Sequence, residues 1–301
     1  MEFYRSIGGA AACRAISEAF HARVATDPVL RPLFPGKSLR CATHQFTAFL
    51  IQFLGGPVSD GEGRVWVSLQ QSHLRFRIGV RERDAWMAQM RMALAEAGLP
   101  EGAQAELTKF FEESSAYLLN DDEPPRVSTP HAFQREWKGL QRIDAAVVAI
   151  QAGDASLIDA ELVALANLRT GRTLLHEAAG AGCQEAVVRL LAFGMNPNIL
   201  DGGSHTPLYS VANECKTERG AAVVQALIAA GAHVDAAGGV KRCTALHMAA
   251  RRGNVAVAQA LLDCGAQINP ADTEGVTPLR RALNCKKPAL VELLRSRGGR
   301  L

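Results

Sequence analysis

A short pattern recurs four times in the C-terminal half of the chain and constrains its architecture more than any other feature. Each copy has a threonine followed two residues later by a leucine, and the copies begin at Thr173, Thr206, Thr244 and Thr277. The starts lie 33, 38 and 33 residues apart, and a glycine closes each unit. A unit of this length is one small group of helices and turns that cannot bury its own apolar face. The sequence therefore predicts that the units stack on one another.

The residues of the motif narrow the fold further. A period of 33 residues that opens with Thr-x-Leu-His, as at His176 and His247, resembles the ankyrin repeat, a β-turn followed by two antiparallel helices. The resemblance covers about residues 165–301 and implies that each of these histidines makes a local hydrogen bond in the turn. Repeats are expected to start near 169, 202, 240 and 273, after a degenerate first unit at 141–166 that caps the stack. Four extra residues, near 216–219, separate the two helices of the second unit.

An acidic stretch that contains prolines marks a boundary between two domains. Residues 120–125 read Asn-Asp-Asp-Glu-Pro-Pro, where the helical periodicity stops and the prolines lack an amide hydrogen. We therefore expect an N-terminal domain over residues 1–120, a linker over 121–137 and the repeat domain over 138–301. A chain of 301 residues is long enough for two domains that each bury a core.

Composition excludes several classes of protein. Apolar residues make up 48% of the chain and charged residues 21%, which is typical of globular domains. A net charge of +3 is too small to indicate nucleic acid or an anionic membrane as a partner. We find no secretory signal, and no apolar run approaches the roughly 20 residues that cross a bilayer. The seven cysteines form no Cys-x-x-Cys pair, so we expect reduced thiols in a cytoplasmic protein.

Apolar residues recur at helical spacing in the N-terminal domain. Within residues 40–54 they fall on one stripe, and Gly-Gly-Pro at 55–57 ends the segment. Residues 81–97 and 101–119 show the same periodicity. The sequence therefore predicts an all-α chain, with the short hairpins of the repeats as its extended segments.

Four motifs in the N-terminal domain, taken in order, resemble the group II truncated haemoglobins. They are Phe-Tyr-x-x-Ile-Gly-Gly at 3–9, Asp-Pro-Val-Leu-Arg-Pro-Leu-Phe-Pro at 27–35, Phe-Leu-x-Gln-x-Leu-Gly-Gly-Pro at 49–57, and His-x-x-Phe-x-Ile-x-x-x-Glu-Arg-Asp-Ala-Trp at 73–86. The resemblance covers about residues 3–120 and implies a two-over-two sandwich of helix pairs that encloses haem b. The glycine pairs at 8–9 and 55–56 would permit its sharp turns, because glycine adopts positive φ at little cost.

The resemblance implies a haem site whose proximal iron ligand is His73. An imidazole nitrogen is the ligand that globins use for haem iron, and the opposite face is left open for a gas. Trp86 falls where the family has a tryptophan whose N–H faces the bound ligand. The other expected haem contacts are Phe34 at the haem edge, Ala42 and Phe46 on the distal side, and Phe76 and Ile78 after the proximal histidine.

Three positions depart from the family pattern. The family usually has a tyrosine that donates a hydrogen bond to bound oxygen, where this chain has His21. A histidine can also donate, can coordinate the iron itself, or can be a plain core residue. Ser72 replaces a basic residue before the proximal histidine, for which Arg75 or Arg77 could substitute. The segment 60–71 lacks the usual His-Pro-x-Leu-Arg-x-Arg, which weakens the expectation of tight haem binding.

Three functions are compatible with this organisation. The favoured one is a haem protein that reversibly binds oxygen or another diatomic gas and is coupled to an ankyrin module for protein partners. The second is an enzyme, an NO dioxygenase or a peroxidase, which would need an external reductase because no flavin or nicotinamide domain accompanies the globin. The third is an interaction scaffold that has lost haem. The sequence assigns no catalytic residue and leaves the gas, the partner and the oligomeric state open.

Basic residues occupy equivalent positions in the last repeats. They are Lys241 and Arg242 in a hairpin loop, Arg251, Arg252, Arg280 and Arg281 on the first helices, and Lys286 and Lys287 in the turn that follows. Stacking in register would bring these residues alongside one another. We therefore expect a basic stripe that binds an acidic protein segment, with a merely solvated face as the alternative.

Overall fold

The computed structural model describes residues 2–34, 36, 38–57, 68–73, 76–120, 134–167 and 171–301. In this part of the chain all regular secondary structure is helical, apart from one isolated antiparallel bridge between Gly238 and Cys243. The all-α prediction is therefore confirmed. The described residues up to Asp144 form one compact unit, and those from Ala145 onward form another. Among the described helices, none is both long and apolar enough to cross a membrane.

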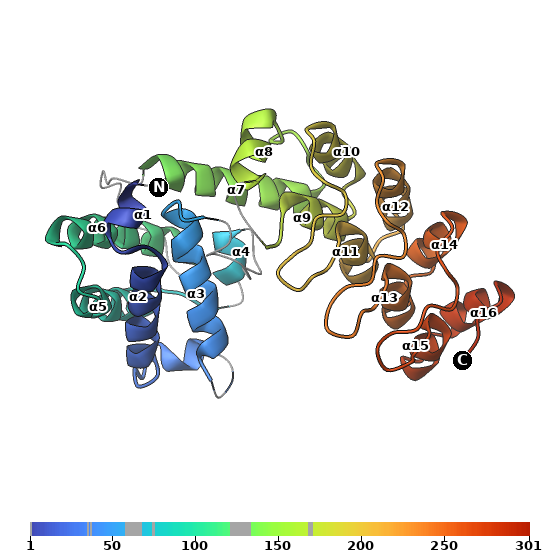
Figure 1. Ribbon diagram of the computed structural model, residues 1–301, viewed down its shortest axis with the longest axis horizontal. Helices are drawn as coiled ribbons and strands as arrows, with labels where there is room; N and C mark the ends of the chain where they lie inside the picture. Colours follow the sequence, from blue (N-terminus) through green and yellow to red (C-terminus); the bar gives the residue numbers. More distant parts are fainter. Residues whose placement is uncertain are drawn as a thin grey trace. The chain divides into compact units, whose positions relative to one another are not determined.

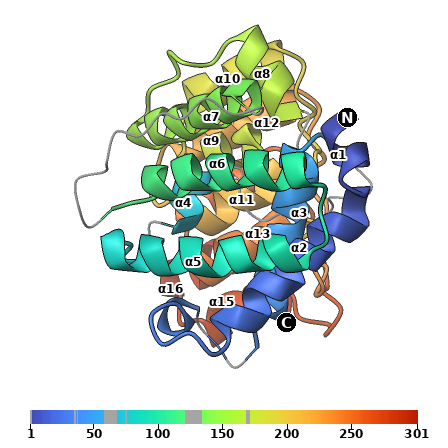
Figure 2. The ribbon, with the colours of Figure 1, turned by 90° about the vertical axis from the view of Figure 1, so that its left-hand side faces the viewer.

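The first unit is a sandwich of two helix pairs. Its helices are α1 (Glu2–Ser6), α2 (Gly9–Val24), the 3₁₀ helix η1 (Arg31–Leu33), α3 (Arg40–Phe53), α4 (Leu69–His73), α5 (Val80–Glu96) and α6 (Glu101–Tyr117). Helix α2 packs against both α3 and α5, and α5 packs against α6. Figure 2 shows α5 and α6 side by side, with α3 behind them. This arrangement confirms the predicted two-over-two sandwich.

The predicted glycine turns lie at the start of α2 and at the end of α3. Gly8, Gly9 and Gly55 have φ of 103°, 64° and 79°, a region that residues with a Cβ rarely adopt. At Gly56 the reason is different, because a Cβ there would lie 2.7 Å from Ile51 Cγ2 and 2.8 Å from the Tyr4 ring. The second glycine pair therefore lets the end of α3 approach α1.

Helix α7 (Gln134–Ala152) begins within the segment that we expected to be a linker. Residues 121–133 of that segment, and the repeat start expected near 169, lie outside the described residues. Trp137 is fully buried in the core of the first unit, where its ring centroid is 5.7 Å from Phe110 and 5.2 Å from Tyr117. Burial of so large an apolar surface stabilises the first turns of α7 against this core.

The second unit is a stack of antiparallel helix pairs (Figure 1). After α8 (Ala160–Asn167) the pairs are α9 (Leu174–Ala181) with α10 (Gln184–Ala192), α11 (Pro207–Glu214) with α12 (Gly220–Ala229), α13 (Ala245–Arg252) with α14 (Val255–Asp263), and α15 (Pro278–Asn284) with α16 (Pro288–Ser296). The first helices of successive pairs pack on one another, as do the second helices. The loop 215–219 between α11 and α12 is longer than 182–183 and 253–254, which confirms the predicted insertion.

Candidate functional site

His73 is the last residue of α4, and its imidazole is tied to the backbone of that helix. Its Nδ1 lies 2.8 Å from the Leu69 carbonyl oxygen and 2.9 Å from Ser72 Oγ. A carbonyl oxygen can only accept, so in the neutral imidazole Nδ1 carries the proton and Nε2 carries the lone pair. This is the tautomer in which Nε2 coordinates a metal, and a carbonyl partner at the other nitrogen is typical of metal-binding histidines.

The segment after His73 is held by Asn120. The Ile78 amide donates to Asn120 Oδ1 at 2.9 Å, and Asn120 Nδ2 donates to the Phe76 carbonyl at 2.8 Å. The Phe76 ring lies 6.5 Å from the His73 ring, measured between centroids. No role could be assigned to Asn120 from the sequence, because a single asparagine at the edge of an acidic stretch carries no signal of a partner 42 residues away. Arg75, one of the two candidates for a propionate contact, lies outside the described residues.

Four of the expected haem contacts form a second group, in which ring contacts connect side chains from different elements. His21 on α2 has its ring centroid 5.7 Å from Phe34, which follows η1, and 6.0 Å from Phe46 on α3. Trp86 on α5 lies 6.4 Å from Phe46. Phe20 on α2 joins them, with its ring centroid 5.1 Å from both His21 and Trp86.

His21 is only 5% exposed, and its imidazole is also tied to the backbone. Its Nδ1 lies 2.8 Å from the carbonyl oxygen of Ser17, one helical turn earlier. Burial lowers the pKa of His21, so the imidazole is neutral near pH 7, with its proton on Nδ1. Nε2 then carries a lone pair, which can bind a metal or accept a hydrogen bond but cannot donate one. The geometry therefore argues against the donor role in the neutral form and is compatible with both other roles, iron coordination and plain core packing.

The remaining expected contact, Ala42, is half-buried on α3, one turn before Phe46. Residues 58–67, which include most of the segment that departs from the family pattern, lie outside the described residues. The side chains that are described fit haem. One imidazole has the ligand tautomer, a second lies among aromatic rings, and these rings offer flat apolar contacts to a flat apolar ring system.

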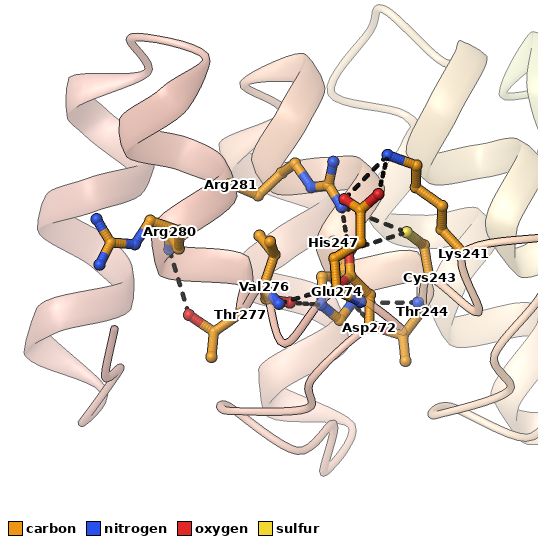
Figure 3. A network of polar contacts seen from close by, with 10 residues as sticks. All are labelled: Lys241, Cys243, Thr244, His247, Asp272, Glu274, Val276, Thr277, Arg280 and Arg281. Atoms are coloured by element: carbon orange, nitrogen blue, oxygen red, sulfur yellow. Dashed lines mark hydrogen bonds and ion pairs between the residues drawn. The ribbon is translucent and has the colours of Figure 1, made fainter.

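In the second unit, part of the expected basic stripe is neutralised by neighbouring carboxylates. Lys241 Nζ lies 2.8 Å from Glu274 Oε1, and Arg281 forms an ion pair with Asp272, whose side chain is fully buried. Figure 3 shows Arg280 pointing away from this network. The sequence analysis treated all these cations as available to a partner, because a sequence does not show which carboxylates of adjacent hairpins form ion pairs with them.

A groove of about 430 Å³ lies on the second unit, and the paired Lys241 and Arg281 are among the residues that line it. His205 and Tyr209 line it and are stacked with ring centroids 4.1 Å apart, and Arg251 also lines it. Arg252 donates from Nε to Asn213 Oδ1 at 3.0 Å. Five of the eight basic residues are exposed and form no ion pair with a carboxylate among the described residues. They are Arg242, Arg251, Arg252, Arg280 and Lys286. Lys287 is half-buried.

Both units match known protein families. Residues 2–120 match the family described as bacterial-like globin. Residues 170–202 match the ankyrin repeat, and residues 215–300 match a family of ankyrin repeats.

The similar proteins fall into the same two groups. The group 2 truncated hemoglobin YjbI of Bacillus subtilis (strain 168) is 33% identical over 106 residues, which are 35% of this chain and 80% of that protein. The crystal structure of the hemoglobin of Chloroflexus aurantiacus is 40% identical, with a TM-score of 0.36, over 39% of this chain and 97% of that one. The human SH3 and multiple ankyrin repeat domains protein 1 is 36% identical over 141 residues, 46% of this chain. The chain covers only 6% of that protein.

Proposed function

Since the chain belongs to the group II truncated haemoglobins through its first unit and carries ankyrin repeats in its second, we propose that it is a haem protein that reversibly binds a diatomic gas. Haem b would supply the iron that binds the gas. The observation that carries the proposal is the hydrogen bond between His73 Nδ1 and the Leu69 carbonyl, because it selects the tautomer with the lone pair on Nε2, the form in which a histidine binds a metal through that nitrogen.

Each expected site residue has a part in this proposal. His73 would hold the iron as its proximal ligand, and Phe76 and Ile78 would supply apolar contacts to the haem. Phe34, Ala42 and Phe46 would bound the distal side and exclude water, and the Trp86 N–H would donate to the gas. His21 would compete with the gas as a second, distal ligand, because its Nε2 carries no proton in the neutral form.

Replacement of the proximal ligand tests the proposal. His73→Ala should lose stable haem binding, seen as loss of the Soret band in protein reconstituted with one equivalent of haem. The matched control is His44→Ala, because His44 is an exposed histidine on α3 of the same unit and should not affect the band. A His73→Ala protein with the parent's Soret and ferrous-CO spectra would show that the assignment is wrong.

The second unit would connect the gas site to another protein. Ankyrin repeats present their hairpins and first helices as a surface for protein partners. The exposed arginines of the last two repeats, of which Arg251 lines the groove, favour an acidic segment, because complementary charge steers and selects a partner. All seven cysteines are free thiols, which is consistent with the reducing cytoplasm as the compartment.

A further inference from the structure

A buried carboxylate lies at the start of the helix that carries His73. Asp144 is fully buried on α7. Its Oδ1 accepts a hydrogen bond from the Leu69 amide at 2.8 Å, and its Oδ2 accepts one from the Gln70 amide at 3.2 Å. The side chains of Ser68 and Tyr117 also hydrogen-bond to it. Asp144 thus receives donors from two backbone amides and two side chains of its own unit.

These contacts determine where α4 begins. The first amides of a helix have no acceptor within the helix, and a carboxylate there satisfies them and complements the positive end of the helix dipole. Helix α4 has only five residues, so its own hydrogen bonds are too few to keep it in place. The hydrogen bonds that Asp144 on α7 accepts from the Leu69 and Gln70 amides therefore keep the start of α4 in place.

Leu69 connects Asp144 to the proximal imidazole. Its amide donates to Asp144, and its carbonyl accepts from His73 Nδ1. We propose that Asp144 is a positioning residue for His73, which acts through this one peptide segment to orient Nε2. This inference rests on the proposed role of His73 as the haem ligand.

Asp144 lies outside the part of the chain that matches the globin family. The globin match ends at residue 120, so the residue that holds the proximal helix lies outside the family's own segment. Trp137, Leu140 and Asp144 occupy one face of α7, three and four residues apart, and all three are fully buried. The same helix continues past Asp144 into the residues of the second unit, where Val147 and Ile150 are buried. A displacement of the buried face of α7 would therefore reach the proximal histidine through the Leu69 peptide.

The variant that tests the inference is Asp144→Asn in the full-length chain. The amide loses one acceptor oxygen and the negative charge at nearly constant volume. In the haem-free protein, the Leu69 and Gln70 amides should exchange their hydrogens faster than in the parent. In the haem-loaded protein, transfer of haem to an acceptor globin should be about 10-fold faster, as for other partners that orient a metal-binding histidine. Asp154→Asn, the same change at an exposed aspartate after α7, should leave both measurements at the parent values.

A second variant, His73→Gly, distinguishes a positioning role of Asp144 from a general effect on protein stability. When His73 is present, Asp144→Asn should shift the iron–imidazole stretching frequency. In His73→Gly with imidazole added, the ligand is not attached to α4, so the same change should leave this frequency unaltered. Asp144→Glu, which keeps the charge, should fold and show a smaller effect in the same direction. The inference is overturned if Asp144→Asn leaves haem transfer unchanged, or if its spectral effect persists with free imidazole. If the parent took up no haem, the proposed function would fail, whereas parent-like exchange at Leu69 and Gln70 in Asp144→Asn would overturn the hold of Asp144 on α4.

Discussion

Two imidazoles of the first unit are held in the same way. His21 and His73 each donate from Nδ1 to the carbonyl of the residue four positions earlier, Ser17 and Leu69 respectively. In both cases the backbone determines the tautomer, and in both the lone pair is on Nε2. Each imidazole could therefore supply its Nε2 as a ligand, and coordination by both would give the haem iron two histidine ligands.

The first prediction concerns His21. We expect the ferrous protein without added gas to be six-coordinate and low-spin, and His21→Leu to convert it to a five-coordinate, high-spin form. Carbon monoxide should then bind at least several-fold faster, because no internal ligand has to leave first. Visible spectra and flash photolysis measure both effects. A parent protein that is already high-spin would contradict the prediction.

The second prediction concerns Trp86. If His21 Nε2 has no proton, the indole N–H is the donor that remains among the expected distal residues. A net hydrogen bond contributes about 0.5–1.5 kcal/mol, so Trp86→Phe should speed oxygen release by roughly 3- to 10-fold. Stopped-flow displacement of oxygen by carbon monoxide measures this rate. Unchanged release would mean that Trp86 is only a packing residue.

At the scale of elements, the sequence predicted most where periodicity is strong and least where a short segment depends on distant partners. Helices α3, α5 and α6 begin and end within two residues of the expected ranges, because each has a continuous apolar stripe. Helix α4 has no such stripe, and its N-terminus depends on Asp144. Since that carboxylate is 75 residues away in the sequence, no local pattern could have revealed it.

In two of the four repeats, a neutral histidine takes part in the cap of the first helix. His176 Nδ1 accepts from the Thr173 amide at 3.3 Å, and its Nε2 donates to the carbonyl of His205 in the next hairpin at 3.0 Å. Thr244 and His247 repeat this arrangement with Val276 as the acceptor. Each histidine thus caps its own helix and connects it to the following repeat. The local hydrogen bond expected from the motif is present, and the structure adds the bond between repeats.

The third prediction is a loss of stability of the second unit in mild acid. Burial lowers the pKa of His176 to about 4, below its value near 6.5 in the unfolded chain. The unfolded state therefore takes up the proton first, so the contribution is complete above pH 6.5 and is lost as the pH falls to about 4. The shift corresponds to roughly 3 kcal/mol in the free energy of unfolding.

Urea unfolding at several pH values measures this loss. All three tryptophans precede residue 145, so their fluorescence reports the first unit, and a far-UV circular dichroism transition without a fluorescence change reports the second. His176→Gln should reduce the dependence on pH between 6.5 and 4. The control His233→Gln changes an exposed hairpin histidine and should preserve it. An equal dependence on pH in His176→Gln and the parent would contradict the prediction.

At the scale of the whole molecule, the sequence predicted both families because each leaves a pattern that does not depend on distant contacts. The repeat period and the motifs between Phe3 and Trp86 are such patterns. Surface charge is different, because its effect depends on which groups pair across neighbouring hairpins. The pairing of Arg281 with the buried Asp272 removes that arginine from the surface available to a partner. A test of the surface must therefore leave Arg281 intact, since its loss would strand a buried carboxylate.

The last prediction is that Arg251 and Arg280 bind acidic segments. Both are exposed on the first helices of adjacent repeats, and Arg251 lines the groove beside His205 and Tyr209. Arg251→Glu with Arg280→Glu should weaken binding of a fluorescent poly-glutamate peptide by about 10-fold at low salt, because each exposed pair contributes about 0.2–1 kcal/mol and reversal adds repulsion. The difference should shrink at physiological salt, where charges are screened beyond about 8 Å. The control Lys216→Glu with Arg295→Glu makes the same change in net charge at exposed sites outside the groove. If both double variants bound the peptide equally weakly, net charge alone would explain the binding, and the arginines would be a solvated face.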